Sequence, residues 1–355
     1  MNRVLVARLD SMGDVLVSGP AVRAVAARSE VVLLCGPRGE EAARMLPGVS
    51  EVIVWDCPWI SNPPGDPSPA HMSAVVEQIR AAEVTEAVVL TSFHQSPLPL
   101  ALLLRLAGIT RITAASVDYA GALLDVRVRP GEDFAEDLPE PERALEIVGA
   151  AGFERPLDSR LAVTGVPDTA WLTERSPYTV LHPGAAVPAR QWPIELYACL
   201  AAALALAGQH VVVTGSESER ELASVISNAV PSVLDLTGRC SLRELAGVLR
   251  GADAVVCGNT GPAHLAAAVG TPVVSLFAPV VPASKWAPYG VPHRLLGDQS
   301  APCKDSRARE CPVPGHPCLA SVTPLTVLRA MNDLQVEVRT RSLVAASADR
   351  AEVAQ

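Results

Sequence analysis

The stretch "VVCGNTGPAHLAAAVGTPVVSLFAP", residues 255–279, decides the fold of this chain. An apolar run breaks at Gly258-Asn259-Thr260-Gly261, continues as a helical pattern that carries His264, and returns to an apolar run. A strand, a glycine turn, a helix and a second strand form the repeating unit of a parallel sheet. Ordinary turn residues would be sufficient for this connection. The amide of Asn259, the hydroxyl of Thr260 and the imidazole of His264 therefore predict that a ligand binds here.

The same alternation runs through both halves of the 355 residues, a length that fits two domains. Near-continuous apolar strands are expected at 3–9, 30–36, 51–55, 86–92 and 111–116, and again at 178–184, 210–216, 232–238, 254–259 and 272–279. Helical patterns separate them at 21–28, 40–46, 72–82 and 99–107, and then at 194–207, 217–229, 241–251 and 262–269.

This pattern predicts an α/β chain of two Rossmann-like, doubly wound domains facing a central cleft, where open α/β sheets bind ligands. The first domain is expected over 1–165 and the second over 166–335. A linker at 165–177 and a polar tail at 336–355 complete the chain.

Charge and composition exclude several classes of function. A formal net charge of −9 argues against nucleic acid as a partner, because binding phosphates needs a basic face. No apolar run approaches the roughly 18 residues that span a bilayer, and "MNRVLVARLD" lacks the apolar core of a signal peptide. We therefore expect a cytoplasmic protein. The spacing of Cys303, Cys311 and Cys318 does not match a zinc knuckle, which favours a structural loop over a metal site.

Three strand ends in the second half carry candidate phosphate- or ribose-binding residues. Pro262 suits the first turn of a helix whose N-terminal N–H groups, next to Asn259, Thr260 and Gly261, favour a phosphate. A plain helix cap is the alternative for Thr260. "LHPGAAVPARQWP" (181–193) places Gly184 and Arg190 in a strand-to-helix loop, where an arginine can clamp a diphosphate. In "TGSESERE" (214–221), Glu217 or Glu219 could contact a ribose, or simply favour the start of a helix.

The first strand ends in "RLDSMGDVLVSGPAV" (8–22), which lacks the glycine fingerprint of a dinucleotide site. A carboxylate at this helix start would repel a pyrophosphate, so Asp14 is predicted to act as a base instead, with Asp10 as its competitor. Ser11 and Gly13 are expected to hold the loop close to the substrate. "FHQS" (93–96), with His94, and the proline-rich loop at 57–69 are expected nearby.

These motifs together resemble the heptosyltransferase-like glycosyltransferases of family 9. "RLDSMGDVLVSGPAV" is similar to the N-terminal signature of the family, "HPGAAVPARQWP" to its phosphate loop, and "GNTGPAHLAAAVGTPVVSLFAPVVPASKWAPYG" to its most diagnostic segment. "PCKDSRARECPVPGHPCLASVTPLTV" also resembles a cysteine pattern of many members. The resemblance covers roughly residues 1–335.

The resemblance implies a GT-B fold and an inverting transfer from a nucleotide-activated sugar, with ADP-heptose as the expected donor. It makes Asp14 the base that deprotonates the acceptor hydroxyl. It places Arg190, Thr260, Gly261 and His264 at the diphosphate and a glutamate near 217–219 at the ribose. Because no D-x-D pair is present, we expect an activity that needs neither a metal nor a cofactor. Asn259 stands where an aspartate is common, and Cys240 replaces a larger apolar residue, so the sugar and the base stay open.

Other functions remain as alternatives. Two Rossmann-like halves also suit an NAD-dependent oxidoreductase, although the missing glycine fingerprint counts against one. A third hypothesis is a protein that binds a sugar nucleotide without catalysis. The presence of Asp14, the predicted base, argues against it. The expected acceptor is a glycan or glycolipid such as lipopolysaccharide core. Whether the protein lies peripherally at the inner membrane face stays open. Another envelope glycan or a small secondary metabolite are the alternative acceptors.

Overall fold

The computed structural model describes residues 2–173 and 177–353. Residues 174–176 of the expected linker and 354–355 of the expected tail lie outside the described residues. The chain divides into two compact units, Met1–Gly165 and Val166–Gln355, and each is described by itself.

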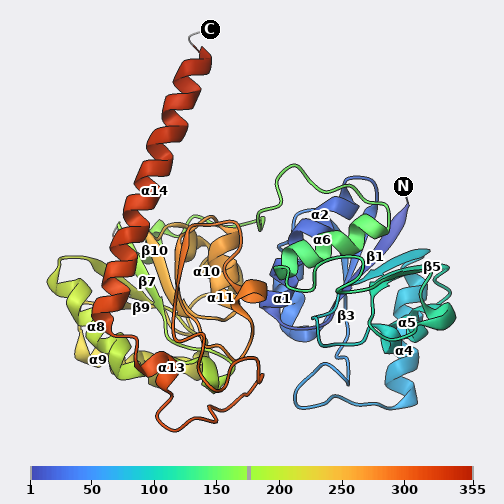
Figure 1. The fold of residues 1–355 in the computed structure, drawn as a ribbon, viewed down its shortest axis with the longest axis horizontal. Coiled ribbons are helices and arrows are strands. Elements are labelled where there is room, and N and C mark those ends of the chain that lie inside the picture. Colours follow the sequence, from blue (N-terminus) through green and yellow to red (C-terminus); the bar gives the residue numbers. More distant parts are fainter. Residues whose placement is uncertain (1, 174–176, 354–355) are drawn as a thin grey trace. The chain divides into compact units, whose positions relative to one another are not determined.

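Unit 1 is built on one parallel sheet of six strands (Figure 1). In space their order is β3 (Val49–Val54), β2 (Glu30–Cys35), β1 (Arg3–Arg8), β4 (Glu86–Val89), β5 (Arg111–Ala115) and β6 (Val126–Val128). The chain starts at β1, winds outward to β3 and then crosses back to β4. In such a sheet the point between β1 and β4, where the winding reverses, is the usual ligand position.

Helices cover both faces of this sheet. Their bounds are α1 (Met12–Val17), α2 (Gly19–Ala26), η1 (Pro37–Gly39), α3 (Glu40–Ala43), α4 (Pro69–Ala81), α5 (Leu98–Leu106), η2 (Gly121–Leu123) and α6 (Glu140–Ala150). On one face, Leu5 and Ala7 of β1 join Ile79 of α4 and Leu104 of α5 in one hydrophobic cluster. On the other, α2 and α6 pack against each other. Because side chains alternate along a strand, Arg8 lies on this second face.

Unit 2 repeats the same winding. Its parallel sheet has the order β12 (His293–Leu296), β11 (Val273–Leu276), β10 (Ala254–Gly258), β7 (Tyr178–His182), β8 (His210–Val213) and β9 (Leu234–Asp235). Its helices are α7 (Ala170–Thr173), η3 (Pro188–Arg190), α8 (Ile194–Leu206), η4 (Glu217–Glu219), α9 (Arg220–Ala229), α10 (Leu242–Arg250), α11 (Gly261–Ala268), α12 (Ala283–Trp286), α13 (Pro317–Ala320) and α14 (Pro324–Val353). The winding reverses between β7 and β10, and the two sheets confirm the predicted α/β class.

Near-continuous apolar strands explain why both sheets are parallel. Every residue of β7 and of β10 is buried, as is needed for strands covered by helices on both faces. Cys303 and Cys318 belong to the hydrophobic core of unit 2, and Cys311 packs against it partly buried. Burial raises the pKa of the Cys318 thiol to about 11, and the neighbouring cysteines add to this. The three cysteines therefore gather in one place and contribute to packing.

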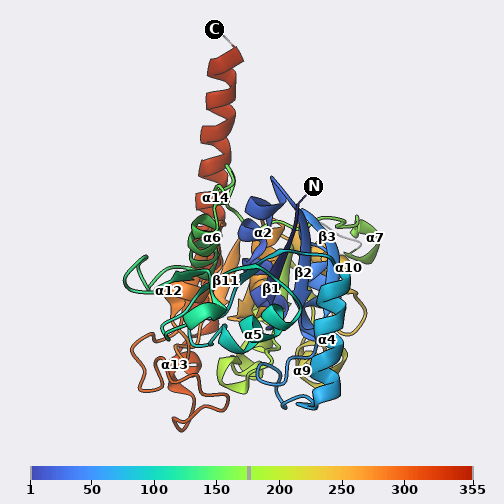
Figure 2. The ribbon, with the colours of Figure 1, turned by 90° about the vertical axis from the view of Figure 1, so that its right-hand side faces the viewer.

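Two helical segments differ in extent from the expectation. The helix expected at 21–28 is α2, which begins two residues earlier at Gly19, and a further short helix, α1, precedes it, because Gly13, Gly19 and Pro20 are helical here and not part of a loop. The segment from 336, expected as a separate tail, continues α14 as one helix to Val353. Its first turns are anchored in the core by Met331 and Leu334, and the alanine-rich sequence beyond them has high helix propensity. Figures 1 and 2 show this later part extending away from the sheet of its own unit.

Candidate functional site

The N-terminus of α11 lies where the winding of unit 2 reverses. Strand β10 delivers the chain to Thr260, which is extended at φ −145° and ψ 171° and precedes the helix without a capping hydrogen bond from its side chain. The first N–H groups of any helix have no partner within the helix and carry its positive dipole end. These donors, next to a side chain that does not cap them, favour an anionic ligand.

Asn259 is the polar group least satisfied by the protein at this place. The residue is only 5% exposed, and neither the oxygen nor the nitrogen of its side-chain amide has a hydrogen-bond partner within residues 2–173 and 177–353. Buried polar side chains are nearly always hydrogen-bonded, because burying them without a partner costs free energy. A ligand that hydrogen-bonds this amide would remove the cost.

Arg190 and His264 lie beside the same helix start. A Cβ atom added to Gly258 would be 2.8 Å from the carbonyl oxygen of Arg190, so the absent side chain lets η3 approach β10 closely. Nη1 of Arg190 donates to the carbonyl oxygen of Asn259 at 3.4 Å. His264, in the first turn of α11, is 6% exposed, and its ring centroid is 6.4 Å from that of Trp286. The structure thus gathers Arg190, Asn259, Thr260 and His264 around one helix end.

Gly184 lies on the other side of the reversal point, after β7. A Cβ atom at this position would be 1.8 Å from Oε1 of Glu219, so only glycine leaves room for that carboxylate. Oε2 of Glu219 accepts hydrogen bonds from the backbone N–H of Ser216 at 2.7 Å and from its hydroxyl at 2.9 Å. His182 lies 4.0 Å from the same oxygen, and burial lowers the pKa of its imidazole.

Of the two glutamates predicted as ribose contacts, the structure brings Glu219 against the candidate site. Glu217 lies two residues earlier, with a side chain that is 70% exposed and paired with Arg220. The hydrogen bond from Arg220 lowers the pKa of the Glu217 carboxyl. The ribose contact of Glu217 stays a prediction, and Glu219 has the more suitable surroundings.

In unit 1, Arg8 is the centre of a buried acidic cluster, which we define as Asp10, Asp14 and Glu140. The arginine side chain is 2% exposed, and its nitrogens lie 3.0 Å from Asp10, 2.9 Å from Asp14 and 3.2 Å from Glu140. One cation thus faces three carboxylates at the carboxyl end of β1. The sequence analysis missed Arg8 and Glu140, although an arginine inside the apolar run "RVLVARL" was a signal.

The carboxyls of the two aspartates in this cluster differ in pKa. Oδ2 of Asp14 accepts hydrogen bonds from the backbone N–H of Ser11 at 3.1 Å and from its hydroxyl at 2.5 Å, while Oδ1 accepts one from Arg8. Arg8 and Ser11 hold the pKa of the Asp14 carboxyl below its usual range, against the effect of burial. Burial instead raises the pKa of Asp10 to about 6, an effect that Arg8 and Gln95 reduce.

The loop after β4 supplies different residues from those predicted. Gln95 donates from its side-chain nitrogen to Oδ1 of Asp10 at 2.5 Å, and Ser92 accepts a hydrogen bond from Arg8 at 2.9 Å. His94 is exposed, and its ring packs edge-on against Phe93 at 5.2 Å. The predicted Ser11 thus contacts Asp14, and Gly13 is buried inside α1. The acceptor contact predicted for His94 stays a prediction.

A comparison with known protein families assigns the chain. Residues 128–316, more than half of it, match the model of glycosyltransferase family 9 (heptosyltransferase). The chain belongs to this family. The resemblance that the motifs predicted is therefore confirmed.

Several characterised relatives share part of this sequence. Lipooligosaccharide heptosyltransferase 2 of Haemophilus influenzae is 36% identical over 120 residues, which are 32% of this chain and 34% of the relative. Lipopolysaccharide heptosyltransferase 2 of Salmonella typhimurium is 29% identical over 154 residues, 42% of each chain. The matched part thus spans between about a third and two fifths of these relatives.

Solved structures agree in fold over nearly the whole chain. ADP-heptose lipopolysaccharide heptosyltransferase II of E. coli has a TM-score of 0.72 and 22% identity, and the match covers 96% of this chain and 100% of that one. E. coli heptosyltransferase WaaC with ADP has a TM-score of 0.68 and 21% identity, covering 94% and 99%. Among the described residues, no helix is long and apolar enough to cross a membrane. No group of three or more histidine, cysteine or acidic side chains within 2–173 and 177–353 could hold a metal ion.

Proposed function

We propose that this protein is an inverting glycosyltransferase that moves a sugar from a nucleoside-diphosphate donor to an acceptor hydroxyl. Membership of family 9 supports the reaction class. The observation that carries the donor assignment is the helix start of α11, with Arg190 beside it and the buried, unsatisfied amide of Asn259. The sugar is a heptose or a related hexose, and the expected donor is ADP-heptose, since relatives are heptosyltransferases.

The diphosphate is proposed to bind in unit 2. Helix N–H groups and an arginine stabilise the negative charge that grows on the diphosphate as the sugar–oxygen bond breaks. Arg190 would supply one charge and α11 the dipole, so the proposed transfer is independent of a metal. Gly184 would let the chain run close to the donor, and Glu219 or Glu217 would accept hydrogen bonds from the ribose.

The proton of the acceptor hydroxyl is proposed to go to Asp14. An ionised carboxylate can accept it in the transition state, and the lowered pKa of Asp14 keeps it ionised at neutral pH. Arg8 nevertheless weakens Asp14 as a base, because it stabilises the ionised form. Asp10 offsets this: above its pKa of about 6 it adds a second negative charge to the cluster and makes Asp14 more basic.

Calorimetric titration of the whole protein with ADP, UDP, GDP and NAD⁺, with and without Mg²⁺, tests the donor site. We expect one nucleoside diphosphate to bind without Mg²⁺, and Arg190→Ala to weaken it by about tenfold, because a charge-assisted contact to phosphate is lost. Arg341→Ala is the matched control, since this arginine of α14 is 66% exposed and pairs with Glu337. Binding of NAD⁺ alone, or a strict need for Mg²⁺, would contradict the proposal.

Turnover then separates an enzyme from a binding protein. Incubation with ADP-heptose should release ADP slowly even with water as the acceptor, and Asp14→Asn should reduce this release by at least about a hundredfold. The anomeric configuration of the released sugar, followed by proton NMR at early times, distinguishes inversion from retention. Donor binding without any release would identify a non-catalytic sugar-nucleotide binder.

A further inference from the structure

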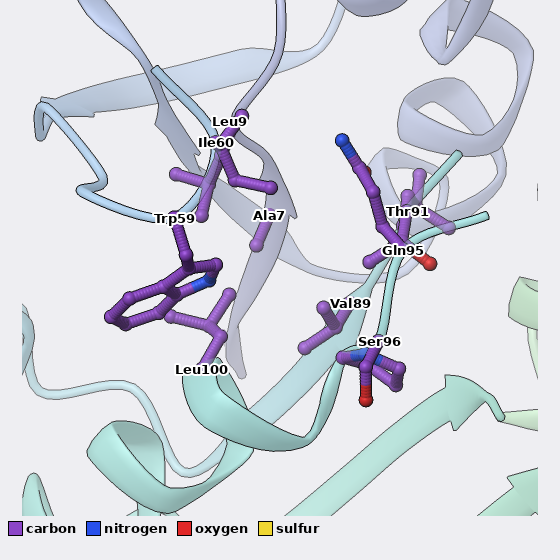
Figure 3. A pocket seen from close by; sticks show the side chains of 11 residues that line it. Ala7, Leu9, Trp59, Ile60, Val89, Thr91, Gln95, Ser96 and Leu100 are labelled. Carbon is purple, nitrogen blue, oxygen red and sulfur yellow. The ribbon is translucent and has the colours of Figure 1, made fainter. Parts of the chain in front are cut away.

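A narrow pocket opens in unit 1 where its winding reverses between β1 and β4. Figure 3 shows Trp59, Ile60 and Leu100 on one side of it and Gln95 and Ser96 on the other. Leu9 follows the end of β1, and Thr91 follows the end of β4, so the pocket lies at the carboxyl ends of these strands. This is the position at which open α/β sheets bind ligands.

Most of the pocket wall is apolar, and one large ring in it is exposed. Trp59 is 40% exposed, although exposing an indole ring to water is unfavourable. The ring packs edge-on against Trp55 at 5.3 Å, and Trp55 stacks on His71 at 5.7 Å. These contacts fix the orientation of Trp59, so the exposed ring forms a preformed surface for a flat apolar group.

The polar side of the pocket connects it to the acidic cluster. The side-chain oxygen of Gln95 accepts a hydrogen bond from the backbone N–H of Ser92 at 3.1 Å, while its nitrogen donates to Asp10. The amide is therefore held at both ends and in a fixed orientation. A hydroxyl of a bound molecule at this rim would lie beside Gln95, which contacts Asp10 directly.

The charges around the pocket exclude an anionic occupant. None of the lining residues is a lysine, arginine or histidine. The loop at 56–69 beside it carries Asp56 and Asp66 and no basic residue. Arg8 is already shared by three carboxylates, so the region is net negative. A phosphorylated or carboxylated sugar would be repelled here.

We propose that this pocket binds the acceptor through an uncharged, flat apolar ring that stacks on Trp59, with a hydroxyl-bearing part extending over Gln95 toward the acidic cluster that contains Asp10 and the proposed base Asp14. The occupant is thus a neutral glycoside or hydroxylated ring compound. This inference rests on the proposed transferase function, and within that function it favours a small neutral acceptor over an anionic lipopolysaccharide core.

Two probes that differ in one carboxylate test the inference. Binding of 4-nitrophenyl β-D-glucopyranoside and of 4-nitrophenyl β-D-glucuronide to the whole protein is measured by saturation-transfer NMR and by titration up to about 20 mM. We expect the glucoside to bind with its aromatic protons closest to the protein, and the glucuronide to bind at least about tenfold more weakly.

Variants locate the binding. Trp59→Ala should weaken glucoside binding by at least about tenfold, and Trp59→Phe should restore part of it, because a ring is again present. Trp171→Ala is the matched control, since this tryptophan of unit 2 is 69% exposed. Unchanged hydrogen-exchange protection of peptides from β1 shows that unit 1 of each Trp59 variant is folded, and binding of ADP shows the same for unit 2. Equal binding of both probes, unchanged binding by Trp59→Ala, or no binding of the glucoside would each overturn the inference.

The outcomes also separate the two proposals. If ADP binds and the glucoside does not, the pocket assignment fails while the proposed transferase function stands. If no nucleoside diphosphate binds, the proposed function fails whatever the glucoside does. Tighter binding of the glucuronide would support an anionic acceptor and refute the charge argument.

Discussion

Replacing Arg8 by methionine should destabilise unit 1 strongly at neutral pH. Methionine retains the apolar stem of the side chain but removes the cation that faces the acidic cluster. Removing one partner of a buried ion pair costs about 3–5 kcal/mol, because the remaining charges stay buried without compensation. Glu140 is 1% exposed, and Asp10 and Asp14 are 13% and 17% exposed, so none of them can turn into water without a change in the backbone.

The free energy of unfolding lost in Arg8→Met should become smaller as the pH falls. Without Arg8 no cation opposes the effect of burial, so the folded-state pKa values of Asp10 and Asp14 rise above their unfolded values. Such a group contributes stability that is present at low pH and is lost as the pH rises through the raised pKa. For each proton that the folded variant binds and folded wild type does not, the lost free energy of unfolding is restored by about 1.4 kcal/mol per pH unit. One such proton, bound throughout the range from pH 7.5 to 5.5, restores about 3 kcal/mol.

The stability of the wild-type protein depends on pH in a different way between pH 7.5 and 5.5. The lowered pKa of Asp14 stabilises wild type above the unfolded value near 3.8, and this contribution is lost only below that pH. Asp10, with a pKa of about 6, takes up a proton between pH 7.5 and 5.5 and stabilises wild type slightly as the pH falls. The difference in stability between variant and wild type therefore narrows only if the variant binds an additional proton at Asp14.

Hydrogen exchange at increasing urea concentrations, followed by mass spectrometry, measures the free energy of unfolding separately for the two units. Peptides from β1 report unit 1, and peptides from β10 report unit 2 as an internal control. Arg44→Met is the matched variant: Arg44 is 53% exposed and pairs with Glu40 on α3, and its loss should cost less than about 0.5 kcal/mol. A difference below about 1 kcal/mol for Arg8→Met at pH 7.5, or one that does not change with pH, would refute the reasoning.

Three further outcomes test individual positions. Gly184→Ala should weaken binding of ADP by at least about tenfold in calorimetry, because the methyl group would displace Glu219, whereas Gly149→Ala, with nothing within 4 Å of the added atom, should leave it unchanged. Asn259→Asp should bind ADP about tenfold more weakly than Asn259→Ala at pH 7.5, since a carboxylate repels the diphosphate; equal affinities would exclude a contact. Asp10→Asn should remove the acidic limb near pH 6 from the rate of ADP release, and an unchanged limb would assign it to another group.

The fold was predictable because its signals are local and repeated. Apolar runs of four to six residues alternate with helical patterns twice over, and short parallel strands buried on both faces leave few alternative architectures. The edge strands β6 and β12 were missed, since "VRV" and "HRLL" mix charged and apolar residues as partly exposed edges do. The helix at α14 was missed for a different reason: its polar sequence shows propensity without a strong apolar stripe.

The candidate site was predictable only where backbone position determines it. In a doubly wound fold, residues that follow a strand lie at the carboxyl-terminal edge of their own sheet. Asp14 after β1 in unit 1, and Gly184 and Asn259 after β7 and β10 in unit 2, could therefore be named from spacing. Side-chain partners could not be named in this way. Which of Glu217 and Glu219 turns toward Gly184 depends on the capping hydrogen bonds of Ser216, and the contact between Arg8 and Glu140 joins residues 132 positions apart.

The two sheets wind identically, yet their reversal points have opposite electrostatic character, and this difference supports the proposed placement of the ligands. In unit 2 the carboxyl ends of β7 and β10 present a helix N-terminus, an arginine and a buried amide. In unit 1 the carboxyl ends of β1 and β4 present three carboxylates that share one arginine. A diphosphate carries at least two negative charges, so binding it beside Asp10 and Asp14 would require those groups to be protonated at neutral pH. Arg8 and Ser11 hold the pKa of Asp14 below its usual range and so keep it ionised, which favours the proposal that unit 2 binds the donor and unit 1 an uncharged hydroxyl.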